Sequence, residues 1–139
     1  FWIFCPTLCF RRQLFDEAQP FESRWRFAVD FSFLANCLFD GNHLVGTPVV
    51  GYRYRRHSAN QTAILTSELT RFEEELRLYG EIGRRARDAG WARSRRTASR
   101  ALIVRAHLVV AAIKSLVRGQ LLRTKKTLGL AVRSVVSNG

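Results

Sequence analysis

A single carboxylate, Asp30, stands in a stretch of mostly apolar residues. It is the only acidic residue between Glu22 and Asp40, and phenylalanine, alanine and valine surround it. Burying a charged carboxylate without a partner costs free energy, so a lone acid in such a stretch indicates a chemical role. Partial burial also makes a carboxylate more basic, which suits it to take a proton from a hydroxyl group. The alternatives are a helix cap and a buried acid whose hydrogen bonds are satisfied.

A second group of reactive side chains follows an aromatic segment. Arg55, Arg56 and His57 lie directly before the polar residues 58–62. Guanidinium groups and imidazole bind phosphate oxygens well, so this cluster suits a ligand that is rich in phosphate. A solvated turn is the alternative interpretation.

The spacing of apolar residues predicts the elements that would position these groups. Residues 23–39 have a helical pattern that contains Asp30, and Gly41 then favours a left-handed helix end. Residues 2–10 and 44–54 are rich in aromatic and β-branched residues and predict strands, each restricted by a proline. Further helices are predicted over residues 67–89, 97–117 and 120–136.

Three segments, taken in order, resemble one enzyme family. The segments CPTLCFRRQLFDE, RFAVDFSFLANCLFDG and PVVGYRYRRHSANQT are similar to the C-terminal half of the catalytic domain of family 2 glycosyltransferases, over residues 4–65. The resemblance implies an α/β fold, in which residues 1–90 form part of a GT-A domain, the fold of nucleotide-diphospho-sugar transferases. Residues 91–139 would follow as a basic tail of amphipathic helices.

The resemblance also implies a function and a set of site residues. The family moves a sugar from a nucleotide-diphosphate sugar to a hydroxyl of a glycan or lipid-linked acceptor, which implies a role in surface glycan or glycolipid synthesis. Asp30 matches the catalytic base, although Val29 stands where the family has a second acid. Arg55, Arg56 and His57 match the loop that closes over the donor diphosphate, and His57 would also touch the metal ion.

Some parts that the resemblance implies are not in this chain. The family holds a divalent cation, Mg²⁺ or Mn²⁺, with an Asp-x-Asp pair in its N-terminal nucleotide-binding half, and the sequence contains no such pair. The sequence also contains no methionine. We therefore expect the chain to be a piece of a longer enzyme and to be inactive alone.

The balance of acidic and basic residues changes after Asp88. Residues 1–88 hold 12 arginines and all 11 acidic residues, whereas residues 89–139 hold 11 basic residues and no acid. Basic residues interrupt every apolar window of this tail, so we expect helices on an anionic membrane surface and no transmembrane span. The expected location is the cytoplasm, with peripheral attachment to the inner membrane face.

Other interpretations stay open. The tail could pack on the folded part with a solvated basic face, or the chain could be a remnant without catalysis. A basic helical module that binds membranes or nucleic acid without catalysis is a further alternative. We expect no nucleic-acid partner, because no recognition helix is evident. Cys5, Cys9 and Cys37 are expected to be buried reduced thiols without zinc.

Overall fold

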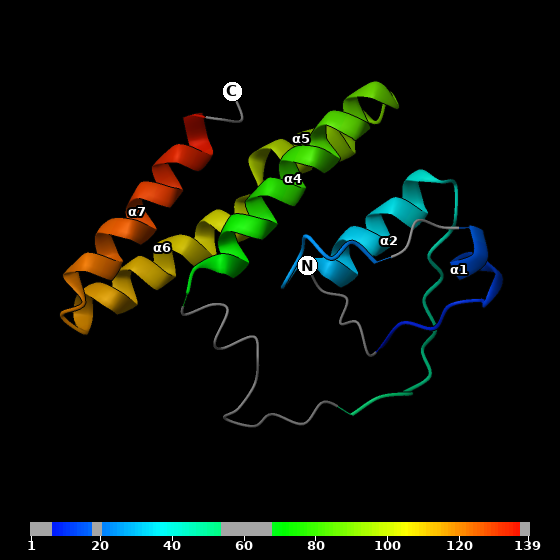
Figure 1. Cartoon of the computed structure of the whole chain (residues 1–139), viewed down its shortest axis with the longest axis horizontal. Helices are drawn as coiled ribbons and strands as arrows, with labels where there is room; N and C mark the ends of the chain where they lie inside the picture. Colours follow the sequence, from blue (N-terminus) through cyan, green and yellow to red (C-terminus); the bar gives the residue numbers. More distant parts are fainter. Residues whose placement is uncertain (1–6, 18–20, 54–67, 137–139) are drawn as a thin grey trace.

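The computed structural model describes residues 7–17, 21–53 and 68–136, and all regular structure in these ranges is helical. The elements in chain order are α1 (Gln13–Glu17), α2 (Val29–Phe39), α4 (Thr70–Asp88), α5 (Ala92–Arg100), α6 (Leu102–Val117) and α7 (Leu121–Val136). Figure 1 shows α6 and α7 as an antiparallel pair, with α1 at the opposite end of the molecule and α2 next to it.

The predicted α/β fold is wrong, because the described residues contain no strand and no sheet. The segment predicted as a strand over residues 44–54 has no regular structure as far as residue 53, and its valines lie exposed. Of the predicted strand over residues 2–10, only residues 7–10 are described, and they form no strand. A strand is stabilised by backbone hydrogen bonds to a partner strand, and no segment in the described ranges supplies one.

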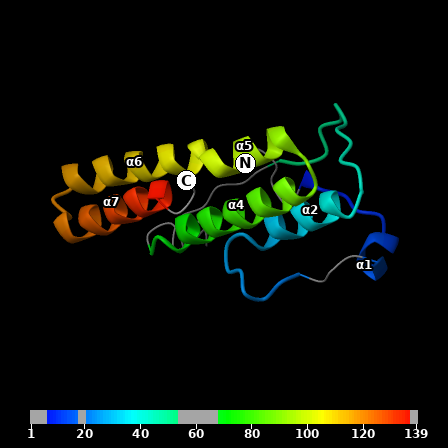
Figure 2. The same cartoon turned by 90° about the horizontal axis from the view of Figure 1, so that it is seen from above.

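The predicted helices are present with altered limits. Helix α2 begins at Val29 and not at residue 23, whereas α4 and α7 lie within the predicted ranges 67–89 and 120–136. The helix predicted over residues 97–117 is divided into α5 and α6 at Ala101, which has a φ of 41°. Figure 2 shows α5 and α6 end to end.

The end of α2 confirms the left-handed cap that the sequence predicts. Gly41 has a φ of +88°, and its amide donates to the carbonyl oxygen of Leu38 at 3.3 Å. The amide of Asn42 donates to the carbonyl oxygen of Cys37 at 3.1 Å. These two bonds form a Schellman motif, which satisfies carbonyl groups that the helix leaves without partners.

The main core joins the helices on both sides of Gly90. Leu69 and Phe72, at the start of α4, pack with Val104 and Leu108 of α6. Helix α6 also packs along α7, and α4 packs along α5 (Figure 2). The core therefore includes residues from the near-neutral part of the chain and from the basic tail.

A second, smaller core holds α2 against α4. Trp25, Ala28 and Leu78 are buried together, and the ring of Phe31 meets the ring of Tyr79 edge-on at 5.6 Å. Because Trp25 and Ala28 directly precede α2, this contact fixes the start of that helix on α4.

Four phenylalanines join the N-terminal segment to α2. The ring of Phe33, which is buried in α2, lies 4.5 Å from the ring of Phe21 and 5.4 Å from the ring of Phe15. Phe10 approaches the same ring edge-on at 5.4 Å. Such aromatic contacts add stability beyond the burial of apolar area.

Candidate functional site

The proposed base, Asp30, lies in the first turn of α2. Its side chain is half-buried, and Oδ1 accepts a hydrogen bond of 2.8 Å from the amide of Phe31. No ion pair within the described part of the chain involves Asp30. The carboxylate therefore lies in the first turn of a helix, where a negative charge is stabilising. No cation in the described part of the chain pairs with it.

The predicted donor-binding cluster lies outside the described residues. Arg55, Arg56 and His57 fall within residues 54–67, which the structure does not describe. Their predicted roles, including that of His57 as a metal ligand, remain predictions.

The start of α2 is held by a carboxylate from α4. Glu74 Oε2 accepts hydrogen bonds from the amides of Phe27 at 2.7 Å and Ala28 at 3.0 Å, and its Oε1 accepts one from the amide of Arg26 at 2.9 Å. Ala28 is the N-cap of α2, and its side chain has no oxygen to cap the helix. Glu74 thus supplies from a distant part of the sequence the acceptor that a local serine or aspartate usually provides.

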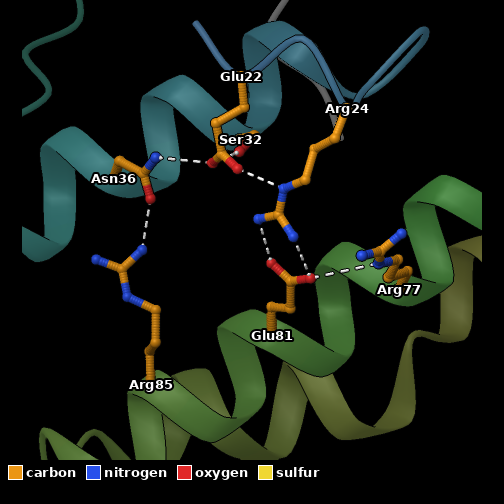
Figure 3. Close-up of polar contacts among 7 residues, drawn as sticks. All are labelled: Glu22, Arg24, Ser32, Asn36, Arg77, Glu81 and Arg85. Atoms are coloured by element: carbon orange, nitrogen blue, oxygen red, sulfur yellow. Dashed lines mark hydrogen bonds and ion pairs between the residues drawn. The ribbon is translucent and has the colours of Figure 1, made fainter. Parts of the chain in front are cut away.

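Figure 3 shows an ionic network between α2 and α4, centred on Arg24. Arg24 binds Glu81 with two parallel hydrogen bonds, of 2.9 Å from Nη1 and 2.8 Å from Nη2. Its Nε donates to Glu22, and Arg77 Nε lies 3.5 Å from Glu81 Oε1. The planar guanidinium of Arg24 therefore joins one carboxylate before α2 to another on α4.

The same network extends along α2. Glu22 Oε1 accepts hydrogen bonds from Ser32 Oγ at 2.9 Å and from Asn36 Nδ2 at 3.3 Å, while Arg85 donates to Asn36 Oδ1 (Figure 3). The hydrogen bond from Arg24 lowers the pKa of Glu22 below its usual value, against the opposing effect of burial. Glu22 is therefore held as an anion and is a weak base.

These side chains line a cleft of about 450 Å³ between α2 and α4. Asp30 does not line it, so the cleft and the proposed base are separate features. Because Glu22 and Glu81 are both paired with Arg24, the cleft residues stabilise the contact between α2 and α4 more readily than they could transfer a proton.

The residues of this network were not predicted as functional from the sequence. The sequence pattern predicted no role for Glu22, Glu74 or Glu81. One signal was present: the start of α2 lacks serine, threonine, aspartate or asparagine at positions 27–28, so an external acceptor was needed.

The cysteines differ from one another. Cys37 is free and buried, as predicted, and burial raises the pKa of its thiol. Cys9 is also free but exposed, so the prediction of burial is wrong for that residue. Cys5 lies outside the described residues.

The divalent cation that the resemblance implies remains a prediction, because its expected Asp-x-Asp pair is not in this chain and His57 lies outside the described residues. The described residues contain no group of three or more histidine, cysteine, aspartate or glutamate side chains that could hold a metal ion.

No helix in the described ranges has the length and the apolar character needed to cross a membrane. No protein-family model, curated protein or solved structure matches the chain.

Proposed function

We propose that the chain supplies the acceptor-side part of a glycosyltransferase, which moves a sugar from a nucleotide-diphosphate sugar to a hydroxyl group. The observation that carries the proposal is the order of the three motifs around Asp30, whose carboxylate stands in the first turn of α2. The acceptor would be a glycan or a lipid-linked sugar. The cationic residues 89–139 favour a place beside the cytoplasmic leaflet, which is rich in anionic lipids.

The surroundings of Asp30 support a role as general base. A base needs a carboxylate that a substrate hydroxyl can reach. Asp30 is partly exposed, and within the described residues it accepts a single hydrogen bond, from the amide of Phe31. Glu22 and Glu81 are each bound to Arg24 and are less suited to this task.

The reaction can be written with Asp30 as the only described residue that takes part. The carboxylate accepts the proton of the acceptor hydroxyl as the oxygen attacks the anomeric carbon of the sugar. The bond from that carbon to the diphosphate breaks, and the nucleoside diphosphate leaves with the bonding electrons. Arg55, Arg56 and His57 would bind the departing diphosphate by charge-assisted hydrogen bonds.

Substitution of Asp30 tests the proposal. In an active polypeptide that contains this chain, Asp30→Asn removes the proton acceptor but keeps the size of the side chain. We expect the rate of nucleoside diphosphate release to fall by about 10²–10⁴-fold, the usual contribution of general-base catalysis. Donor affinity, measured by calorimetry, should change little.

Asp88→Asn is the matched control. Asp88 is exposed in the last turn of α4, so the same chemical change there should leave transfer unaltered. Transfer retained by Asp30→Asn to within a few fold would exclude Asp30 as the base.

A further inference from the structure

Helix α6 has an inner face that is fully used in packing. Val104, Leu108, Ala112 and Ser115 are buried, and Leu108 is completely inaccessible to solvent. These residues lie at intervals of three and four, so they form one side of the helix. The strongly exposed apolar residues elsewhere on α6 are therefore not needed for the core.

The outer side of α6 is nevertheless apolar. The exposed fraction of its large apolar side chains is between 42% and 82%, a set made up of Leu102, Ile103, Val109, Val110, Ile113, Leu116 and Val117. We call these residues the outer apolar face. Leu102, Val109, Ile113 and Leu116 follow one another at intervals of seven, four and three residues, so they share one side of the helix, and all four are exposed. A contiguous apolar surface of this kind marks a site of interaction.

A cationic cleft lies next to this face. It has a volume of about 240 Å³, and its lining contains the cations Arg71, Lys114, Arg118 and Arg123 together with His107, and no acidic residue. Arg71 pairs with Glu75 at 3.3 Å, whereas Lys114, Arg118 and Arg123 form no ion pair within the described ranges. Several unpaired cations around one concavity favour binding of an anion.

The cleft and the outer apolar face share a border. Val110 belongs to the face and also lines the cleft. His107, Lys114 and Arg118 follow one another at intervals of seven and four residues, so they run along α6 beside Val110 and Val117. A ligand in the cleft would therefore lie directly beside exposed apolar side chains.

We propose that the cleft binds the phosphate group of an anionic phospholipid while the outer apolar face of α6 enters the membrane interface. A phospholipid has both the negative charge and the apolar chains that these two neighbouring surfaces require. The charge of residues 89–139, with 11 basic residues and no acid, attracts the same surface from a distance.

Other occupants match only part of this surface. A nucleic acid would satisfy the cations but would leave the outer apolar face in contact with water or phosphate. A second copy of the chain would cover the apolar residues, but it carries the same net charge of +12 and would be repelled.

Vesicle co-sedimentation of the whole 139-residue chain tests the proposal. Vesicles of phosphatidylcholine alone are compared with vesicles that also contain phosphatidylglycerol. We expect binding only to the anionic vesicles, and weaker binding as salt is added. Equal binding to both kinds of vesicle, or to neither, would overturn the proposal.

Paired charge variants test the cleft itself. Lys114→Gln with Arg118→Gln removes two cleft cations, and we expect vesicle affinity to fall roughly 25-fold, at about fivefold for each cation near an anionic surface. Arg93→Gln with Arg96→Gln removes the same charge from exposed positions on α5. We expect this control to lose much less affinity. An equal loss in the two pairs would show that the attraction is diffuse and that the cleft is not a site.

A third pair tests the outer apolar face. Ile113→Ser with Leu116→Ser should reduce vesicle binding roughly tenfold or more and should leave the circular dichroism spectrum unchanged, since both side chains are exposed.

Competition experiments identify the kind of ligand, with duplex DNA and inorganic phosphate at matched ionic strength as the competitors. Displacement from vesicles by DNA, together with unaltered vesicle binding by the serine pair, would identify a nucleic-acid surface instead. Displacement by inorganic phosphate alone would identify a site for free phosphate.

Discussion

Glu74 is the residue on which the position of Asp30 depends most directly. Its carboxylate accepts hydrogen bonds from the amides of Arg26, Phe27 and Ala28, just before the turn that contains Asp30. Burial alone would raise the pKa of Glu74, but these three hydrogen bonds outweigh it and hold the pKa below the usual 4.5. The ionised form therefore stabilises the fold.

This shift predicts a pH dependence for the stabilisation by Glu74. Because the pKa is lower in the folded state, the contribution is complete above the unfolded pKa and is lost as pH falls through the folded pKa. We expect Glu74→Gln to lower the free energy of unfolding by about 1–2 kcal/mol at neutral pH. The difference in the free energy of unfolding between Glu74→Gln and the natural protein should become smaller below pH 4.5. Urea denaturation across a pH series measures this difference.

Glu73→Gln is the control, because Glu73 is exposed in the same turn of α4. It should have nearly the stability of the natural protein at every pH. If the difference in the free energy of unfolding between Glu74→Gln and the natural protein stays constant down to acid pH, the ionised carboxylate of Glu74 is not its cause.

The sequence could predict that Asp30 lies in a helix, but it placed the start of that helix at residue 23 and not at Val29. It also could not predict Glu74 as the residue that supports the start. The apolar spacing around Asp30 is local, whereas Glu74 is 47 residues from Phe27 along the chain. Only the missing N-cap at Ala28 indicated that a distant acceptor was required. The pairing of Arg24 with Glu81 is equally non-local.

At the scale of elements, local signals predicted helix ends well. Gly41 and Gly90 stop α2 and α4 because each adopts a positive φ that other residues adopt only with strain. The break between α5 and α6 was missed, because Ala101 adopts a φ of 41° with no glycine or proline to mark it. The strand over residues 44–54 was predicted from composition, which cannot specify a partner strand.

Gly90 offers a test of this argument. It has a φ of +73°, and a Cβ added there would meet no atom within 4 Å, so Gly90→Ala would add backbone strain without a steric clash. We expect the substitution to cost about 1–2 kcal/mol of stability, measured by thermal denaturation. Gly46→Ala is the matched control, because Gly46 also has open space but no positive φ. A melting temperature equally unchanged in both variants would refute the requirement for glycine at the end of α4.

At the scale of the whole molecule, the error in fold class has a clear physical origin. The α/β prediction rested on a resemblance to a family that contains a sheet, and it assumed that residues 44–54 pair with other strands. In the described residues, the helices bury their apolar faces against one another without a sheet, chiefly where α4 meets α5 and α6 and where α6 meets α7. Helical periodicity is a property of a single segment, whereas a sheet depends on several segments together.

The shared core predicts that residues 1–90 do not keep their structure alone. Removing residues 91–139 would expose Leu69 and Phe72, which are 7% and 2% accessible in the core with Val104 and Leu108. Exposing each large apolar side chain costs about 1.5–3 kcal/mol, a large share of the roughly 5–15 kcal/mol that stabilises a typical domain.

The loss of structure should extend to the region around Asp30, because Glu74 and Leu78 of α4 hold the start of α2. We therefore expect a polypeptide of residues 1–90 to show no cooperative transition in urea. The measurement is urea denaturation monitored by the fluorescence of Trp25, which is buried in the whole chain. The reference is the whole chain with Trp91→Phe, so that both proteins lack the exposed indole of Trp91. A transition of equal midpoint in the two proteins would show that the region around Asp30 folds independently of the basic helices. A lost transition would mean that the proposed membrane-binding helices are also needed to position Asp30.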